Sequence, residues 1–507
     1  MSAREPRKKS LPMLPALFGA ALALCGARSL AAPPAVPTQH NDNARTGANL
    51  SETILTPANV NGLQKLYTIS LDANVNGQAL YVPGVTIQGA VHNVLYLSTS
   101  NNTNNSPCSI YAFDADNPSS GPLWRHPFTT SAEWTTCTPV IDPSTATMYV
   151  LTKDNSDTGK TRLHAFDITT GIEKTGSPHT VAASVIGSGD GSVNGYVHFD
   201  TTHANERSGL LFLNGVVYIA FAHNTDSYPY HGWVLGYSYN GSKFALVGRF
   251  CTTPNGGDGG VWMAGDGLAA DSNGNIYCTV GNGTFDINTG GKDYGMCVLK
   301  LSTPRLKVVD WFAPYDELSN SNADLDFGNA GVLGIPGTDR LFTGGTKFGS
   351  AFLLDSTNMG HFTSTPPDHV LQRFDNLMSD NNVGQTPVCW NASSEEYVYL
   401  WPRNAGLMQF QYDPSQGLFN PAGIYKQSSS LTSGGSLAVT ADGSSNGILW
   451  AVGNNNTVYA LDATDVTKTP LWSASLPSVG HFQFPTIVNG KAYVPTGSAS
   501  VIVYGLP

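Results

Sequence analysis

The stretches His92–Asn102, HNVLYLSTSNN, and Ser109–Asn117, SIYAFDADN, decide the fold of this chain. Each is an apolar run rich in Tyr, Leu, Ile or Val, and each ends in Ser, Asn or Asp. Apolar runs of this length that are bounded by turn-forming residues predict two short β-strands. The same pair of stretches recurs to the end of the chain, so it is a structural repeat.

Seven further copies follow the first. In order they are ATMYVLTKDN with RLHAFDITTG, GVVYIAFAHN with GWVLGYSYNG, GNIYCTVGNG with MCVLKLSTP, DRLFTGGTKFG with AFLLDSTNMG, EYVYLWPRNAG with MQFQYDPSQG, GILWAVGNNN with VYALDATDV, and KAYVPTGSAS with VIVYGLP. Their first strands begin near Asn93, Thr147, Val216, Asn275, Arg340, Tyr397, Ile448 and Lys491. This spacing of roughly 45 to 70 residues accommodates a four-stranded blade with its loops. The sequence therefore predicts an all-β protein that folds as an eight-bladed β-propeller, a single toroidal domain.

The two ends of the repeat predict how the ring closes. The last copy is short and ends at Pro507, whereas Leu66–Ser70 near the other end is a strand candidate without a partner of its own. We expect this strand to complete the last blade.

Composition and charge exclude several classes of protein. Only 12% of the 507 residues are charged and 54 are glycine, which disfavours amphipathic helices and hence a helical bundle. The net charge of −11 opposes binding to a phosphate backbone, so nucleic acid is not an expected partner.

The first 31 residues have the pattern of a cleavable signal peptide. Basic residues precede the apolar run Leu11–Cys25, and Ser29–Ala31 offers small residues for cleavage. We expect a periplasmic or secreted protein with an N-terminal arm at 32–60 and the propeller at 61–507. No later stretch is long and apolar enough to predict a membrane span.

Six cysteines remain after this segment, and an even number in an exported protein favours disulfide pairing. The absence of CxxCH excludes a covalently attached c-type haem in the chain. Any electron acceptor would then be a separate molecule.

Two glycine-rich segments are candidates for a ligand site. Gly259-Gly260-Val261-Trp262 is followed after one strand by Val280-Gly281-Asn282-Gly283-Thr284. Glycines such as Gly260 let the backbone approach a flat ligand, on which Trp262 would stack. Asn282 offers an amide oxygen to a hard cation. A packing tryptophan and an Asn-Gly turn explain the same residues equally well.

Two further segments add charges. Asp316, Asp324 and Asp326 lie within eleven residues and could ligate a metal or supply a base, although loop acids in solvent are the plainer explanation. Lys347 stands in Gly-Thr-Lys-Phe-Gly at the end of a predicted strand and would suit an anionic cofactor. A solvated turn lysine is the alternative.

The region around the third copy is polar. Asp226, which follows His223, could be another cation ligand or a simple turn acid. His198, Asp200, Asn205 and Arg207 are expected to form a buried hydrogen-bond network.

Taken together, these segments resemble the pyrroloquinoline quinone (PQQ) dehydrogenase-like eight-bladed propellers. The likeness includes NDNARTG at 41–47 and LTPANV at 55–60. GGVW resembles the family phrase whose Trp lies under the quinone, and VGNG resembles the phrase whose Asn binds calcium, which implies these roles for Trp262 and Asn282.

The resemblance assigns roles to the charged segments as well. APYD with DLDFG is similar to the segment that supplies the base, which implies that role for Asp326. Gly328 stands where lanthanide-using members have an Asp, so calcium is implied. TKFGSAFLLDSTNMG places Lys347 at the cofactor-contacting position.

The chain departs from the family pattern at three points. It has no adjacent Cys-Cys pair, Leu325 stands where the family has Trp, and only Asp226 lies near the place of the family's calcium-binding glutamate. Members of the same fold that bind no quinone exist.

The sequence supports three hypotheses for the function. The first is an exported PQQ- and calcium-dependent dehydrogenase that oxidises a small alcohol or sugar and passes electrons to a separate acceptor. The second is a cofactor-free propeller that serves as a scaffold or as a glycan- or protein-binding module of the cell envelope. The third is a polysaccharide lyase or hydrolase, whose candidate residues are His198, Arg207, His231 and His481.

Overall fold

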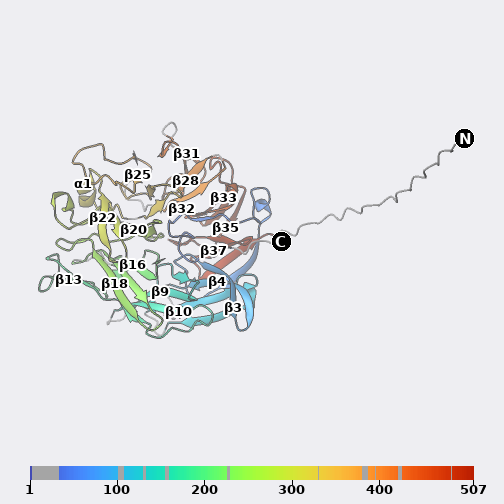
Figure 1. Ribbon diagram of the computed structural model, residues 1–507, viewed down its shortest axis with the longest axis horizontal. Helices are drawn as coiled ribbons and strands as arrows, with labels where there is room; N and C mark the ends of the chain where they lie inside the picture. The colour runs from blue at the N-terminus through green and yellow to red at the C-terminus, as the bar shows by residue number, and fades with distance from the viewer. Residues whose placement is uncertain are drawn as a thin grey trace. The chain divides into compact units, whose positions relative to one another are not determined.

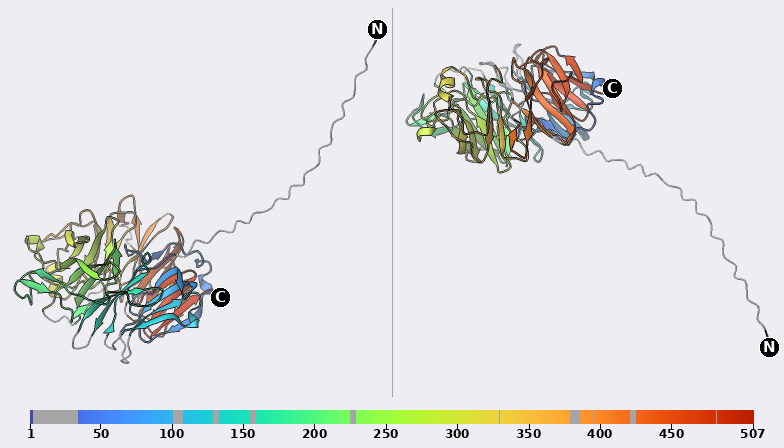
Figure 2. Two further views of the ribbon diagram at one scale, coloured as in Figure 1. Left: turned by 60° about the horizontal axis from the view of Figure 1, so that its bottom comes forward. Right: turned by 90° about the horizontal axis from the view of Figure 1, so that it is seen from above.

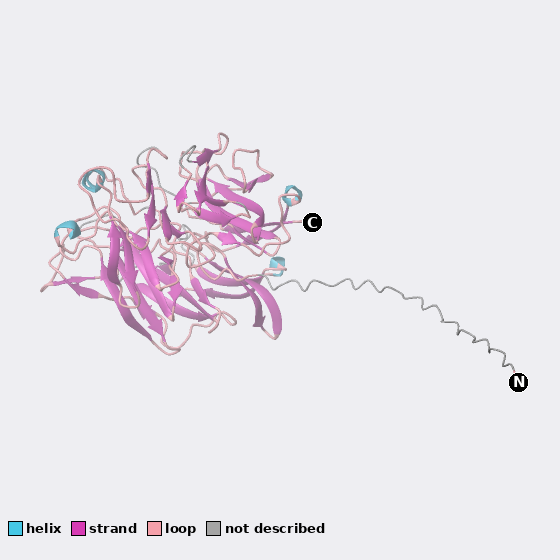
Figure 3. Ribbon diagram, turned by 45° about the horizontal axis from the view of Figure 1, so that its top comes forward, coloured by secondary structure: helices cyan, strands magenta, loops and turns pink. Residues whose placement is uncertain are grey.

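The computed structural model describes residues 1–2, 34–100, 108–128, 133–154, 159–224, 229–328, 330–378, 386–393, 395–420, 425–480 and 482–507. The predicted export segment therefore lies almost wholly outside the described residues, as do Asp226 and His481. The chain from Pro33 to Pro507 forms one compact unit. Strands dominate it (Figure 3). The described helical elements are α1 (Glu317–Asn322) and the 3-10 turns η1 (Val60–Gly62), η2 (Pro118–Ser120) and η3 (Ile287–Thr289). No helix in the described ranges is long and apolar enough to cross a membrane.

The first four blades follow one another along the chain. Blade 1 contains β3 (Leu80–Ile87), β4 (Ala90–Ser98), β5 (Ser109–Asp114) and β6 (Pro122–Pro127). Blade 2 contains β7 (Glu133–Trp134), β8 (Val140–Asp142), β9 (Thr147–Asp154), β10 (Thr161–Asp167) and β11 (His179–Thr180). A separate hairpin, β12 (Ser184–Ile186) and β13 (Tyr196–His198), precedes blade 3. Blade 3 contains β14 (Ala204–Asn205), β15 (Leu211–Leu213), β16 (Val216–His223), β17 (Trp233–Tyr239) and β18 (Phe244–Cys251). Blade 4 contains β19 (Ala269–Ala270), β20 (Asn275–Thr279), β21 (Val298–Ser302) and β22 (Lys307–Phe312).

The other four blades complete the ring. Blade 5 contains β23 (Val332–Gly334), β24 (Arg340–Thr343), β25 (Ala351–Asp355) and β26 (Gln372–Phe374). Blade 6 contains β27 (Val388–Asn391), β28 (Glu396–Leu400), β29 (Met408–Asp413), β30 (Leu418–Phe419) and β31 (Tyr425–Gln427). Blade 7 contains β32 (Gly435–Asp442), β33 (Ser445–Gly453), β34 (Thr457–Asp462) and β35 (Trp472–Ser475), with β1 (Ala48–Asn49) parallel to β32. Blade 8 contains β36 (Thr486–Val488), β37 (Lys491–Thr496), β38 (Ser500–Gly505) and β2 (Gln64–Ser70). The predicted eight-bladed propeller is confirmed.

The cores of the molecule lie between neighbouring blades. In β9, Met148 belongs to an apolar cluster with Ile110 of blade 1, whereas the next residue, Tyr149, belongs to a cluster with Val217 of blade 3. Successive side chains of a strand point to opposite faces, so each face of a blade meets a different neighbour. This arrangement explains why β9 and β16 are buried along their whole length rather than on alternate residues.

The ring closes where the two ends of the chain meet. Strand β2 pairs antiparallel with β38, and Ile69 pairs with Val501. The cluster between the last and first blades contains Val503 together with Leu95. Figure 1 shows β37, in red, beside the blue strands β3 and β4, and Figure 2 shows the same neighbourhood from two other sides. The prediction that residues 66–70 complete the last blade is confirmed.

The segment 36–49 contacts all eight blades. Its successive hydrogen-bonded neighbours are Tyr81, Ile141, Leu210, Ala270, Gly334, Cys389, Val439 and Ile487. Arg45 lies in this segment and is fully buried; its guanidinium donates to the carbonyl oxygens of Gln39 (2.6 Å) and Leu268 (3.0 Å). We call residues 36–49 the inner arm. The inner arm links the blades to one another through the centre of the ring.

The expected disulfide pairing is not found in the described part of the chain. Cys137, Cys251, Cys278, Cys297 and Cys389 are buried thiols without a disulfide, and Cys108 is buried as well. Each lies within one of the apolar clusters between blades, where it fills space as a small hydrophobic side chain. Burial raises the pKa of Cys137, Cys251 and Cys278 to about 12, so these thiols are protonated and unreactive at neutral pH.

Candidate functional site

Loops of blades 3, 4 and 5 enclose a cavity of about 910 Å³. We call it the rim cavity. Its lining includes Trp262, Asn282, Asp326 and Lys347, the four side chains for which the sequence predicts the most specific roles. It also includes Arg207, Asn224, Tyr230, Asp258, Glu317, Leu318, Ser321, Asn322 and Asp324. Four residues that are separated by up to 85 positions in the chain therefore share one cavity.

Equivalent positions in three blades bring these residues together. Asn224 follows β16, Asn282 lies shortly after β20, and Lys347 lies shortly after β24. Each of these strands is the second of its blade, so their ends fall on the same rim of the ring.

Asp326 is the buried centre of the polar contacts. One carboxylate oxygen, Oδ1, accepts the backbone N–H of Asn282 (2.9 Å), and the other, Oδ2, lies 2.5 Å from Lys347 Nζ. The backbone N–H of Lys347 donates to the Asp326 carbonyl oxygen (3.0 Å). Both oxygens are thereby fixed, and the carboxylate is held in one orientation.

Asn282 presents an oxygen that has no donor among the described residues. Its Nδ2 donates to Asp324 Oδ1 (2.8 Å), which fixes the amide, while its Oδ1 is buried and makes no hydrogen bond. A buried polar atom without a partner costs free energy, so such an atom points to an absent ligand.

Glycines allow these groups to come so close. A Cβ added at Gly281 would lie 2.5 Å from Asp326 Oδ1 and 3.0 Å from the Trp262 ring. At Gly260 a Cβ would lie 2.9 Å from Trp262 Nε1. Gly260 thus packs behind the tryptophan rather than lining the cavity. At Gly328 a Cβ would lie 2.5 Å from the backbone nitrogen of Gly281, so this position has no room for an aspartate.

Trp262 is half-buried, and a cation covers its ring. The guanidinium carbon of the exposed Arg207 lies 5.5 Å from the Trp262 ring centroid and 5.9 Å from that of Phe482, which belongs to the segment between blades 7 and 8. A flat ligand between the Trp262 ring and the Arg207 guanidinium would make van der Waals contact on both of its faces. The two groups would then have to be about 7 Å apart. Such a ligand would move the Arg207 side chain outwards.

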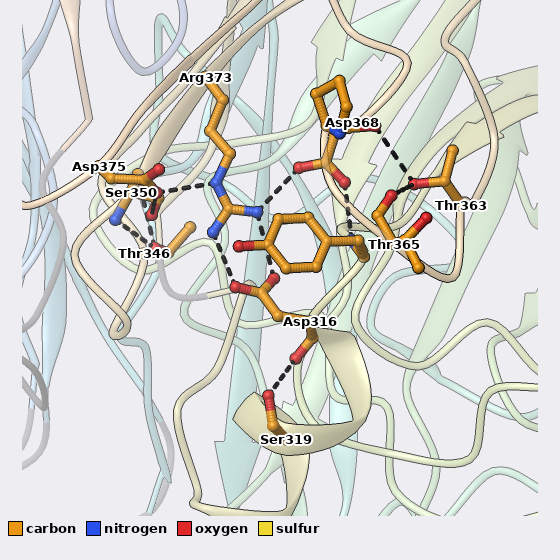
Figure 4. Close-up of polar contacts among 11 residues, drawn as sticks. Asp316, Ser319, Thr346, Ser350, Thr363, Thr365, Asp368, Arg373 and Asp375 are labelled. Carbon is orange, nitrogen blue, oxygen red and sulfur yellow. Dashed lines mark hydrogen bonds and ion pairs between the residues drawn. The ribbon is translucent and has the colours of Figure 1, made fainter.

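A partly buried ion-pair network holds the start of α1 in place. Arg373 donates to Asp316 (2.7 Å), Asp368 (2.8 Å) and Asp375 (2.8 Å), as Figure 4 shows. The backbone N–H of Tyr315 also donates to Asp368 (2.7 Å). Asp316 immediately precedes α1, so this network fixes the start of the helix whose residues line the rim cavity. Of the three predicted loop acids, Asp316 is therefore structural, whereas Asp324 and Asp326 line the cavity.

Glu317 and Asn224 are two of the rim-cavity residues for which the sequence predicted no role. Glu317, in the first turn of α1, is buried, and this burial together with the neighbouring Asp316 raises its pKa to about 7. The Asp-Glu pair at 316–317 was the available signal. Asn224 is the second, and it offers an amide oxygen in the region where the sequence predicts Asp226 as a ligand, a residue outside the described ranges.

The expected polar network of His198, Asp200, Asn205 and Arg207 does not form as one cluster. Arg207 covers Trp262, and Asn205 is buried in β14. His198 and Asp200 line a smaller cavity, described below. Strand β14, which contains Asn205 and pairs with β16, lies in the chain between Asp200 and Arg207.

Comparisons with solved structures recover the same architecture. A quinohemoprotein alcohol dehydrogenase from Comamonas testosteroni superposes on 93% of this chain and 80% of its own with a TM-score of 0.61, at 15% sequence identity. The chain shares its β-propeller fold with this enzyme. Sqt1 of Saccharomyces cerevisiae is similar over 87% of this chain and 99% of its own, with a TM-score of 0.50 and 10% identity. No family model and no curated protein sequence matches the chain. The propeller described here is thus like these two proteins in fold, at low sequence identity.

Proposed function

We propose that this protein is a dehydrogenase that oxidises a small alcohol or a sugar with PQQ and calcium bound in the rim cavity. The observation that carries the proposal is the convergence of Trp262, Asn282, Asp326 and Lys347 on one cavity, with a buried amide oxygen that has no donor among the described residues. The similarity in fold to an alcohol dehydrogenase supports it.

The donor set fits calcium. Asn282 Oδ1 and the Asp326 carboxylate provide hard oxygen ligands, and Asn224 offers a third oxygen in the same cavity. Calcium takes six to eight oxygen ligands, of which carboxylates and amide oxygens are usual members. Calcium bound to Asn282 Oδ1 would satisfy the oxygen that no described group satisfies.

The cavity also fits a flat molecule that carries carboxylates. The half-buried Trp262 ring provides a stacking surface, and Lys347 and Arg207 provide two cations beside it. A guanidinium can pair with a carboxylate through two hydrogen bonds, so Arg207, once displaced from the ring, is suited to hold the ligand's acid groups.

Asp326 is proposed to take the hydroxyl proton of the substrate. Its carboxylate is oriented by the Asn282 N–H and by Lys347, and it lines the cavity in which the substrate would bind. Trp262 and Lys347 would hold the quinone, and Asn282 and Asp326 would hold calcium; together the two groups would supply the hydride acceptor and the Lewis acid for this oxidation. The products would be a carbonyl compound and the reduced cofactor, which a separate acceptor would reoxidise. α1, which begins at Glu317, lines the same cavity as Asp326.

We propose further that the protein acts in the periplasm or outside the cell, as the signal-like residues 1–31 suggest. Expression with this segment in a bacterial host, followed by mass determination of the exported form, tests this part. A product that stays in the cytoplasm at full length would contradict it.

A thermal-shift titration with PQQ, with and without Ca²⁺, tests the cofactor site. A ligand that binds only the folded state raises the melting temperature, so wild type should show a shift that depends on Ca²⁺. Trp262→Ala and Lys347→Ala should lose most of the shift. Asp326→Asn should keep PQQ binding but lose dye reduction with a panel of alcohols and sugars.

Lys468→Ala is the matched control, because Lys468 also pairs with an aspartate, Asp462 (3.1 Å), but on the exposed surface of blade 7. This variant should retain the shift of wild type. If wild type gives no shift with PQQ and Ca²⁺, the dehydrogenase proposal is wrong, and a cofactor-free binding propeller becomes the better explanation.

A further inference from the structure

A second cavity, of about 180 Å³, lies beside the rim cavity and shares Tyr230 with it. We call it the side cavity. The hairpin β12–β13 and blade 3 enclose it, and its lining is rich in groups that bind metals: Asp190, His198, Asp200, His223 and His231. None of these side chains has a role in the proposed oxidation.

Three groups meet at one point of this region. Asp200, His203 and His223 each place one potential ligand atom within 4.8 Å of the other two, and no other group of three or more such residues is found in the described part of the chain. His203 Nδ1 lies 2.7 Å from Asp200 Oδ2. The rings of His203 and His223 are 5.4 Å apart.

The backbone fixes all three residues. Strand pairing sets Ala204 opposite His223, and the N–H of Asn224 donates to the His203 carbonyl oxygen (2.8 Å), so His203, in the turn directly before β14, is held beside His223 of β16. Asp200 Oδ1 accepts the N–H groups of Thr202 (2.9 Å) and His203 (3.2 Å), which leaves Oδ2 directed at the imidazole. The ring of Tyr230 stacks on that of His223 (5.0 Å). A preformed arrangement reduces the cost of ordering the ligands.

We propose that Asp200, His203 and His223 bind one divalent transition-metal ion of the zinc class. Two imidazoles and one carboxylate are a ligand set that suits such ions, whereas calcium and magnesium prefer oxygen alone. At the usual Zn–N and Zn–O distances of about 2.1 Å, one ion can contact both atoms of the Asp200–His203 pair. The neighbouring cation, Lys153, is itself held by a hydrogen bond that it donates to the Ala204 carbonyl oxygen (3.0 Å).

Three protein ligands leave at least one coordination position for water or a small ligand. Asp200 and His223 line the side cavity, so this position would face the cavity. The site is separate from Asn282 and Asp326, and its occupancy does not depend on PQQ.

Metal titration of the purified protein tests the proposal. Metal-free protein in excess Ca²⁺, which occupies oxygen sites, is titrated with Zn²⁺ in a calorimeter and with Co²⁺ by visible absorption. We expect one equivalent of each ion, with the absorption bands of cobalt bound to nitrogen. His203→Ala and His223→Gln should weaken Zn²⁺ binding at least about tenfold.

His361→Ala is the control, because His361 also pairs with an aspartate, Asp310 (3.1 Å), without a second histidine in the described cluster. This variant should bind like wild type. His203 is half-exposed, so its removal should leave the fold intact even if His223→Gln lowers the melting temperature. Wild type that binds no stoichiometric ion, or His203→Ala that binds as tightly as wild type, would overturn the proposal.

Discussion

Glu317 is the residue whose charge in the rim cavity should change near neutral pH. Its pKa is raised from 4.5 to about 7, so between these values the folded protein binds the proton more tightly than the unfolded chain does. The unfolding free energy therefore falls as the pH rises through this window. Glu317→Gln cannot ionise and should melt ~1–2 °C higher relative to wild type at pH 8 than at pH 5.

Scanning fluorimetry of both proteins across pH 4 to 9 measures this difference. Asp413→Asn serves as the control, because hydrogen bonds from Ser415 lower the pKa of the exposed Asp413 and place its titration below the window. A difference between Glu317→Gln and wild type that does not vary with pH would show that the carboxyl group is not perturbed in the folded state.

Residue type and local sequence predicted Asp326 and other parts of the rim cavity, but not that Glu317 rather than Asp316 lines it. Trp262, Asn282 and Lys347 stood out because each lies beside glycines, and these glycines permit the close contacts seen around Asp326. The roles of Asp316 and Glu317 could not be told apart, since adjacent acids in one loop look alike. The structure distinguishes them, because Asp316 pairs with Arg373 whereas Glu317 lines the cavity.

At the scale of elements, α1 depends on a single arginine. Arg373 pairs with three carboxylates, and the side chain of Asp368 is only 1% exposed. Removing the cation leaves a buried charge without compensation, so Arg373→Gln should lower the unfolding free energy by about 3 kcal/mol. The PQQ-induced thermal shift should also shrink, because α1 would no longer be held at the rim cavity.

Denaturant unfolding and the PQQ titration together check this prediction. Arg340→Gln is the matched control in the same blade, because Arg340 pairs with one partly exposed carboxylate, Asp355 (2.9 Å). If the two variants lose the same stability and both keep the PQQ shift, the network of Arg373 has no special role in holding α1.

The repeat predicted half of each blade. The recognised pairs of segments are the second and third strands, and five of the eight predicted starts coincide with the first residue of β9, β16, β20, β24 and β37. β9 and β16, for example, are eight residues long and buried along their whole length, so their apolar runs are conspicuous. The first and fourth strands are often only two to four residues long, as in β19, β23 and β26, and such short runs give little sequence signal.

At the scale of the whole molecule, the inner arm should contribute a large share of the cooperativity. Arg45 is fully buried and reaches the carbonyl oxygens of residues in the arm and in the segments that lead to blades 3 and 4. Arg45→Ala would leave these acceptors and the buried Asp266 without their cation. We expect Arg45→Ala to lower the unfolding free energy by about 3–5 kcal/mol and to unfold in a single cooperative transition.

Guanidinium unfolding followed by tryptophan fluorescence measures this loss. Arg305→Ala, at an exposed turn of blade 4, removes the same side chain from the surface and should change the midpoint little. A midpoint for Arg45→Ala that equals that of wild type would mean that the blades hold together without this part of the arm.

The inner arm also sets the order in which the protein can be completed. A ribosome makes residues 36–49 before any blade exists, yet their neighbours include Val439 and Ile487, which are among the last to be made. Strand β2 likewise has to wait for β38. The inner arm is therefore made before all eight blades but completes its contacts only after blade 8 has been made, and only then can the ring become one body.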